Sequence, residues 1–240
     1  RTPLTAFSGE PTPVAKKAFA PLTAPDGYGF QNRFVGDYVL YGSGGAWWGE
    51  GKPSTLYLKK YATNDAIQTI DLTHGVDRIE VMGDGAVVIG AAKNDLQFSS
   101  IALGRSPEVQ QTFTLEKASQ GELRSHGFFF SPKPDGTGIL GIPIRTEGDA
   151  IDSHFKDSAT VLFLHVDQEK QFTRLGSLAG KNESDRDDQC VASCVDWYGN
   201  ARPIFFHGRI FALMGYTLVE GAIQDATIVE TTQTNFAPTR

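Results

Sequence analysis

The sequence predicts an all-β protein: a β-propeller built of four-stranded, blade-like repeats, and part of a larger propeller. Three observations lead to this prediction. Short runs of alternating apolar and polar β-forming residues fill the chain after residue 30, strong helical patterns are nearly absent, and one strand–turn–strand pattern occurs four times. The four copies read NRFVGDYVLYGSG, DRIEVMGDGAVVIG, HGFFFSPKPDGTGILGI and RPIFFHGRIFALMG.

Each copy is followed by two more short β-rich segments, which gives about four strands per repeat. These are STLYLKKY and IQTIDL, then LQFSSIAL and QQTFTLE, then TVLFLHV and QFTRLGSL, and finally TLVEGAI and ATIVETT. Their turn glycines, Gly36, Gly83, Gly136 and Gly208, are 47, 53 and 72 residues apart. The first two spacings are close to the period of a propeller blade, ~40–50 residues.

We therefore expect repeats at residues 31–75, 76–124, 125–180 and 195–240. Insertions near 145–157 and 181–200 lengthen the last spacing.

The segment before the repeats, residues 1–30, contains five of the twelve prolines and predicts an extended strap or linker. As a strap, it would be pinned to the folded body by Phe7, Phe19 and Tyr28; the alternative is disorder.

Only PEVQQTFTLEKASQGEL contains a run of good helix formers, and its Thr-Phe-Thr centre favours a strand. Radial repetition protects strand edges, so a propeller is the simplest closure of such repeats. A β-sandwich with accidental similarity between its hairpins is the alternative fold.

Composition limits the partners of the chain. Its 240 residues are 40% hydrophobic, enough for a sizeable core, and its net charge is −6 with lysines and arginines scattered singly or in pairs. Without a basic stripe, a nucleic-acid partner is not expected. No apolar run approaches the ~18 residues of a membrane-spanning helix, so we expect no transmembrane segment in this chain.

The segment from LQFSSIALGRSP through SHGFFFSPKPDGTGILGIPI and TVLFLHVDQEKQFTRLGSL resembles secreted bacterial proteins with a C-terminal β-propeller domain distantly related to WD repeats. NRFVGDYVLYG and RPIFFHGRIFALMGYTLVEGAI extend the resemblance over Asn32 to Ile223, in the family's order. The chain departs from the family at the two insertions and in its proline-rich start. The resemblance implies a propeller fold, a longer propeller chain, and a secreted, periplasmic or cell-surface location; it implies no established reaction.

Cys190 and Cys194, in DQCVASC, are the only cysteines. A zinc site usually needs four ligands, often from two such pairs, and there is no second pair. We therefore expect a local disulfide, which agrees with an oxidising compartment. Two metal thiolates are the alternative.

The acidic stretch KNESDRDDQC brings Asp185, Asp187 and Asp188 close together in the sequence. Carboxylates at alternate positions can converge on Ca²⁺, but the mid-loop glycine and closing glutamate of an EF-hand are missing. A solvated loop is the alternative, and no other cofactor is expected.

GSGGAWWGEG lies between two predicted strands, and its glycines would let Trp47 and Trp48 project from a loop and bind a partner. The alternative is that both fill the gap between two blades. His126 and His207, at comparable places in two repeats, read as structural histidines with satisfied hydrogen bonds.

The sequence contains no HExxH pair, phosphate loop or GxSxG elbow. It therefore favours a non-catalytic module that scaffolds a partner: the remaining half of the propeller or another subunit. The alternative function is a hydrolase with a metal or carboxylate site in the propeller channel, assembled from separate blades.

Overall fold

A computed structural model describes Phe7, Gly9 and residues 13–27, 29–45, 51–146, 160–180 and 201–236. These residues form four antiparallel sheets and no α-helix; the 3-10 turns that they contain in full are η2 (Lys16–Ala18) and η3 (Ser125–Gly127). The predicted all-β class is confirmed. Four sheets are formed rather than the two of a sandwich, so the sandwich alternative is wrong.

Each sheet is folded from one continuous part of the chain, with its strands in sequence order. Sheet 1 contains β1 (Gly29–Val35), β2 (Tyr38–Gly44), β3 (Ser54–Lys60) and β4 (Gln68–Leu72). Sheet 2 contains β5 (Arg78–Met82), β6 (Gly85–Ala92), β7 (Asp95–Ala102) and β8 (Glu108–Leu115). The segment PEVQQTFTLE thus forms a strand, as predicted.

Sheet 3 has five strands because a short strand preceding it joins the sheet. It contains β10 (Phe129–Pro132), β11 (Gly138–Thr146), β12 (Thr160–Val166) and β13 (Phe172–Leu178), while β9 (Ala118–Gln120) pairs with the end of β11. Sheet 4 contains β14 (Arg202–Phe206), β15 (Arg209–Met214), β16 (Thr217–Gln224) and β17 (Thr227–Asn235).

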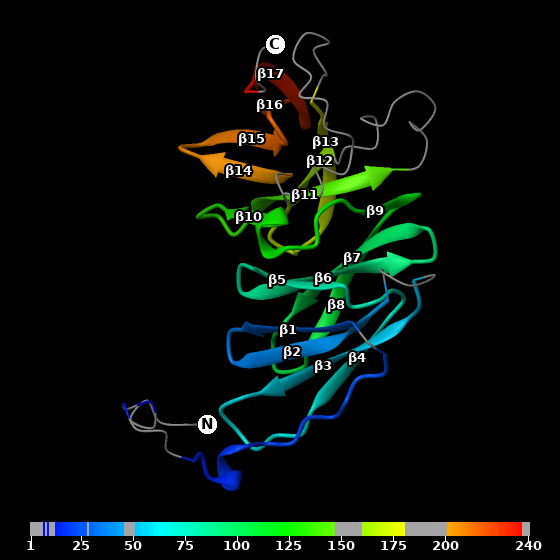
Figure 1. Ribbon diagram of the computed structural model, residues 1–240, viewed down its shortest axis with the longest axis vertical. Coiled ribbons are helices and arrows are strands. Elements are labelled where there is room, and N and C mark those ends of the chain that lie inside the picture. The colour runs from blue at the N-terminus through cyan, green and yellow to red at the C-terminus, as the bar shows by residue number, and fades with distance from the viewer. Residues whose placement is uncertain are drawn as a thin grey trace.

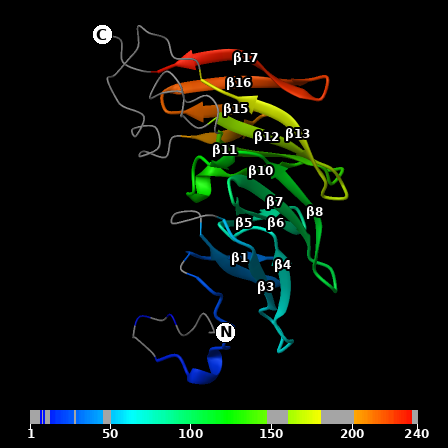
Figure 2. The same ribbon diagram turned by 90° about the vertical axis from the view of Figure 1, so that its right-hand side faces the viewer.

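The four sheets follow one another in a single row, as the views of Figures 1 and 2 show. Sheets 1 and 4 lie at opposite ends, so the described part of the chain forms an open row and not a closed ring. The first strands of the sheets lie side by side: β5 is next to both β1 and β10, and β10 is next to β14. We call the side formed by β1, β5, β10 and β14 the first-strand edge.

The turns that open sheets 1 and 2 follow from local sequence. Val35 pairs with Tyr38 and Met82 with Gly85, so β1–β2 and β5–β6 are joined by two-residue Gly-Asp turns. Gly36 and Gly83 have φ of +53° and +64°, which glycine adopts without strain. The strand–turn–strand patterns predicted from sequence are confirmed at both places.

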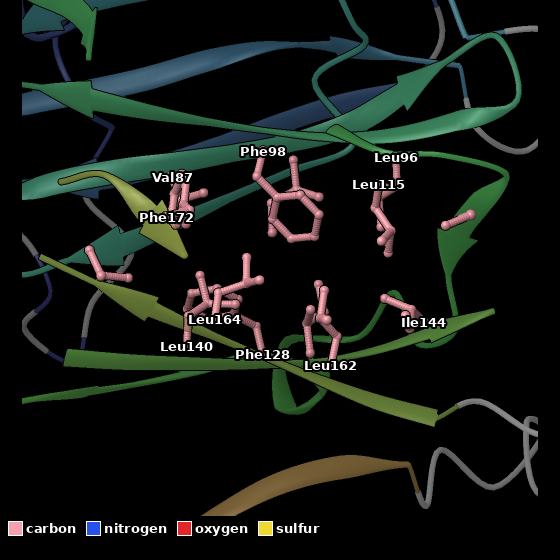
Figure 3. Close-up of a cluster of buried hydrophobic side chains, with 14 of the residues drawn as sticks. Val87, Leu96, Phe98, Leu115, Phe128, Leu140, Ile144, Leu162, Leu164 and Phe172 are labelled. Carbon is pink, nitrogen blue, oxygen red and sulfur yellow. The ribbon is translucent and has the colours of Figure 1, made fainter. Parts of the chain in front are cut away.

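Three hydrophobic clusters fill the spaces between neighbouring sheets, so the core is divided into layers. Figure 3 shows the one between sheets 2 and 3, where Val87, Leu96 and Phe98 face Leu140, Leu162 and Leu164. Phe98 is fully buried and meets Phe113 and Phe172 edge to face, with ring centroids 5.9 and 6.4 Å apart. Burying one such side chain contributes about 1.5–3 kcal/mol. Each sheet is therefore stabilised chiefly by its neighbours.

The proline-rich start is not pinned as the strap interpretation expected. Phe7 and Phe19 are 76% and 69% exposed, and Tyr28 lies outside the described residues. The contact with sheet 1 is instead polar, because the Ser43 hydroxyl donates a hydrogen bond to the carbonyl of Asp26. The two phenylalanines therefore do not hold this segment in place.

Candidate functional site

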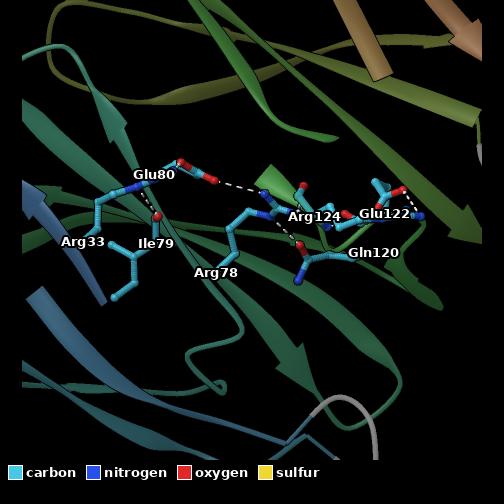
Figure 4. Close-up of polar contacts among 7 residues, drawn as sticks. All are labelled: Arg33, Arg78, Ile79, Glu80, Gln120, Glu122 and Arg124. Carbon is cyan, nitrogen blue, oxygen red and sulfur yellow. Dashed lines mark hydrogen bonds and ion pairs between the residues drawn. The ribbon is translucent and has the colours of Figure 1, made fainter. Parts of the chain in front are cut away.

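Charged side chains gather at the first-strand edge, where β1 and β5 meet the segment that leads from β9 into η3 (Figure 4). This arginine–glutamate cluster contains Arg33 of β1, Arg78 and Glu80 of β5, Gln120 of β9, and Glu122 and Arg124 of the connection. It joins three sheets by side chains that are far apart in the sequence.

Arg78 lies at the centre of this cluster and is only 4% exposed. Its Nε donates to Gln120 Oε1 at 2.8 Å and its Nη1 to Glu80 Oε1 at 3.0 Å. Its Nη2 donates to the carbonyls of Glu122 and Arg124, at 2.8 and 3.0 Å. The planar fork of a guanidinium can serve several acceptors at once. Arg78 thereby ties β5 to the chain entering sheet 3.

Burial lowers the pKa of Arg78 to about 10; the nearby Glu122 carboxylate opposes this shift and the Arg33 charge adds to it. The side chain stays protonated at neutral pH. A buried cation needs paired charges and hydrogen bonds, so the contacts of Arg78 are a condition for its burial.

Glu80 is shared between two arginines. Its Oε1 accepts from Arg78, while Oε2 forms an ion pair with Nη2 of Arg33, whose Nε also donates to the Ile79 carbonyl at 3.2 Å. Since β5 is the edge strand of sheet 2, this contact occupies a carbonyl on an open sheet edge. Arg33 therefore connects sheet 1 to sheet 2.

Glu122 is held by Arg124 in a two-point pair, with Arg124 Nε 2.9 Å from Oε1 and Nη2 3.0 Å from Oε2. Burial acts to raise the pKa of the Glu122 carboxyl, but the hydrogen bonds from Arg124 outweigh it, and the pKa lies below its usual value. A carboxyl kept ionised in this way is poorly suited to act as a general acid near neutral pH.

A second buried polar group lies in the connection between β4 and β5, which joins sheet 1 to sheet 2. His74 is fully buried, with Nδ1 2.7 Å from the Gly75 carbonyl and Nε2 2.8 Å from the Ser99 hydroxyl, which is 2.9 Å from the Thr112 hydroxyl. Because a carbonyl only accepts, Nδ1 carries the proton, and neutral Nε2 accepts from Ser99. Burial lowers the pKa of His74, opposed by the Gly75 hydrogen bond and the Asp77 charge.

The residues for which the sequence predicted a site lie outside the described residues. These are Trp47, Trp48, Asp185, Asp187, Asp188, Cys190 and Cys194. Their predicted roles in partner binding, calcium binding and a disulfide therefore stay predictions. In the part of the chain that is described, no group of three or more histidine, cysteine, aspartate or glutamate side chains is placed to hold a metal ion.

The prediction for the two histidines is wrong. His126 Nε2 is buried without a hydrogen-bond partner. It lies 3.5 Å from Glu122 Oε2, and the two groups form an ion pair only when the ring is protonated. His207 is exposed in the β14–β15 turn at φ +48°, with its ring against Phe206. Their similar places in the repeats do not give them similar environments.

No protein-family model matches this chain, and neither does any curated protein. No helix in the described residues is both long and apolar enough to cross a membrane.

Sequence reasoning missed the arginine–glutamate cluster because it treated these charges as scattered. A signal was present in Arg78-Ile-Glu80: two opposite charges two residues apart share one face of a strand that is otherwise apolar. Charged side chains on a buried strand face need partners, so this pattern could have identified the strand as part of a polar cluster. The partners Gln120 and Glu122 could not have been found this way.

Proposed function

We propose that this chain is a non-catalytic β-propeller module that acts outside the cytoplasm, as a scaffold or binding subunit of a cell-surface or envelope assembly. The observation that carries the proposal is the arginine–glutamate cluster. Its two carboxylates, Glu80 and Glu122, are the most buried in the described residues, and arginines engage both of them. Arg33 and Arg78 also join neighbouring sheets, because Arg33 of β1 contacts Glu80 of β5 and Arg78 of β5 contacts Gln120 of β9. Such a cluster supports architecture better than proton transfer.

The propeller is supported by how the sheets are repeated. Each is a four-stranded antiparallel unit in sequence order, with β9 added to sheet 3, and each packs face to face on the next with its first strand at the common edge. Propeller blades have this arrangement. The location outside the cytoplasm rests on the resemblance to secreted proteins.

A partner is supported by the two end faces of the row. Phe30 and Phe34 on sheet 1 are 51% and 63% exposed, and Phe211, Leu213 and Leu218 on sheet 4 are partly exposed. Among the described residues no further sheet covers either face. Because exposed apolar patches usually mark interaction sites, we propose that further propeller sheets, from the remaining half of the propeller or another subunit, pack there.

The test is the size of the protein in solution, measured by light scattering, with peptide sequencing of every chain that co-purifies. We expect a particle larger than the 26.1 kDa chain. Leu213→Asp should dissociate it, whereas Thr173→Asp, on an exposed strand position of sheet 3, should not. A monodisperse monomer of 26.1 kDa would overturn the proposal.

The tryptophans provide a second test of binding. Replacing Trp47 and Trp48 with alanine should leave the melting temperature nearly unchanged and weaken capture of the co-purifying chain, as expected for aromatic side chains at an interface. A large fall in melting temperature would instead place both in the core.

The hydrolase alternative is tested by metal analysis of the purified protein after dialysis. We expect no stoichiometric metal. A metal retained at one equivalent per chain would favour the enzyme.

A further inference from the structure

One feature of the arginine–glutamate cluster points to a ligand: its charges do not balance. Arg33 and Arg78 share the single carboxylate of Glu80, one oxygen each. The other acceptors of Arg78 are an amide oxygen and two carbonyls, which carry no charge. The Glu122 carboxylate is engaged by Arg124 at both oxygens. This group of three arginines, Arg33, Arg78 and Arg124, and two glutamates, Glu80 and Glu122, thus has an excess of one positive charge.

This excess occurs in a chain whose net charge is −6, so it is a local property of the site. Arg78 and Glu80 are 4% and 6% exposed, and charges so placed are only weakly screened. Burial is the main cause of the lowered pKa of Arg78, about 10, and the Arg33 charge adds to it. An anion nearby would therefore stabilise the group.

An anion can reach the group through Arg33. Its side chain is 38% exposed, and its Nε and Nη2 are engaged by the Ile79 carbonyl and Glu80. Among the residues that the structure describes, Nη1 has no partner. A donor on a partly exposed, otherwise fixed guanidinium is prepared to bind one oxygen atom.

We propose that the first-strand edge binds a carboxylate of an acidic segment in a protein partner, with Arg33 Nη1 as the donor. A carboxylate carries the single negative charge that the group lacks, whereas a phosphate dianion would exceed it. Val81 and Phe129 on the neighbouring strands β5 and β10 are 44% and 49% exposed, so the segment carries apolar side chains beside its acidic ones. This inference rests on the proposed function as a binding module and specifies the chemistry of its partner.

The probe is a fluorescein-labelled peptide of six alternating aspartates and leucines, capped at both ends, with fluorescence anisotropy as the readout. The matched control peptide has asparagine in place of each aspartate. We expect the aspartate peptide to bind at least about tenfold more tightly, because a charge-assisted hydrogen bond is stronger than a neutral one. Equal binding of the two peptides would overturn the proposal.

Three variants locate the site. Arg33→Gln should weaken aspartate-peptide binding about tenfold. Arg105→Gln, at an exposed arginine in the β7–β8 connection, should leave it unchanged. Gln120→Glu places a carboxylate within hydrogen-bond distance of Arg78 Nε, 2.8 Å from the present amide oxygen, and so supplies the missing charge internally. It should weaken peptide binding while raising the melting temperature.

Gln120→Glu keeps the test valid even if Arg33→Gln fails to fold. If Gln120→Glu lowers the melting temperature and leaves peptide binding intact, the group has no charge deficit and the inference fails. The last test is competition with inorganic phosphate. Displacement of the peptide by equimolar phosphate would show a general anion site and overturn the carboxylate assignment. Both readouts use the chain alone, so failure here leaves the light-scattering test of the proposed function untouched.

Discussion

The burial of His74 makes the stability of the fold depend on pH. It is fully buried, and its neutral ring accepts a hydrogen bond from Ser99 and donates one to the Gly75 carbonyl. Protonation would place a buried charge against sheet 2 and reverse the Ser99 hydrogen bond. The lowered pKa of His74 expresses this cost.

Stability should therefore fall as the pH drops below the ordinary histidine value of 6.5. There the unfolded chain binds a proton at His74 that the folded chain does not bind, until the pH reaches the lower folded pKa. Urea unfolding between pH 7.5 and 5 measures the effect, and His74→Gln should flatten the slope. His207→Asn, at an exposed histidine, is the control and should keep it. An unchanged slope in His74→Gln would contradict the prediction.

Gly90 is required by a close approach of two backbones. A Cβ at this position would lie 1.7 Å from the Gly75 carbonyl oxygen and 2.9 Å from His74 Nδ1. The approaching segment cannot easily move, because Gly75 N donates to the Ala91 carbonyl and Val76 N to the Ser43 carbonyl, each at 3.0 Å. This segment joins sheet 1 to sheet 2.

Gly90→Ala should lower the free energy of unfolding by about 1–3 kcal/mol, the usual cost of an overpacked site. Gly104→Ala, with open space around its position, should be nearly neutral. Urea denaturation of both variants measures the difference, and equal stabilities would show that the β6 contact can relax.

At the level of residues, the sequence predicts turns better than interactions. Gly36 and Gly83 are recognisable because a two-residue turn between alternating strands needs a positive φ. Arg33 and Glu80 are not recognisable as a pair, because their contact depends on how two separate sheets pack. The cluster could therefore be found only from the structure.

At the level of elements, β9 shows the limit of reading repeats along the chain. Four strands per repeat were predictable because alternation and turn residues are local. Residues 118–120 follow β8 and would be assigned to sheet 2 by sequence, yet they pair with β11 at residues 144–146 of sheet 3. A pairing between segments about 25 residues apart leaves no local signal.

Ser119→Pro tests this pairing. Ser119 pairs with Arg145, and proline cannot donate a backbone hydrogen bond there, so we expect a loss of about 1 kcal/mol or more. Ser119→Ala keeps the donor and should have little effect. Thermal unfolding compares the two, and equal melting temperatures would mean that β9 contributes nothing to sheet 3.

At the level of the whole molecule, the repeats predict a row of sheets, and the prediction that the chain is part of a larger propeller implies an open row; the rotation between successive sheets could not be predicted. Blade-like units are visible as a period in the sequence. Whether the row closes depends on the rotation between successive sheets, which is set by how side chains such as Phe98 and Phe172 meet in each layer. One sequence does not specify that angle.

The crossing of β9 into sheet 3 also affects how the molecule would respond to force. Sheets that touch only their neighbours can detach one at a time, as in linear repeat proteins. Here β9 follows β8 directly in the chain but is hydrogen-bonded to β11, and Arg78 of β5 donates hydrogen bonds to Gln120 at the end of β9 and to the Glu122 carbonyl just after it. Sheets 2 and 3 are thus joined by backbone pairing as well as by side-chain packing, and sheet 1 is joined to sheet 2 by the Arg33–Glu80 ion pair and by backbone hydrogen bonds such as Lys93 N to the Gly51 carbonyl. Under tension we therefore expect sheet 4 to detach first and sheets 2 and 3 to unfold together.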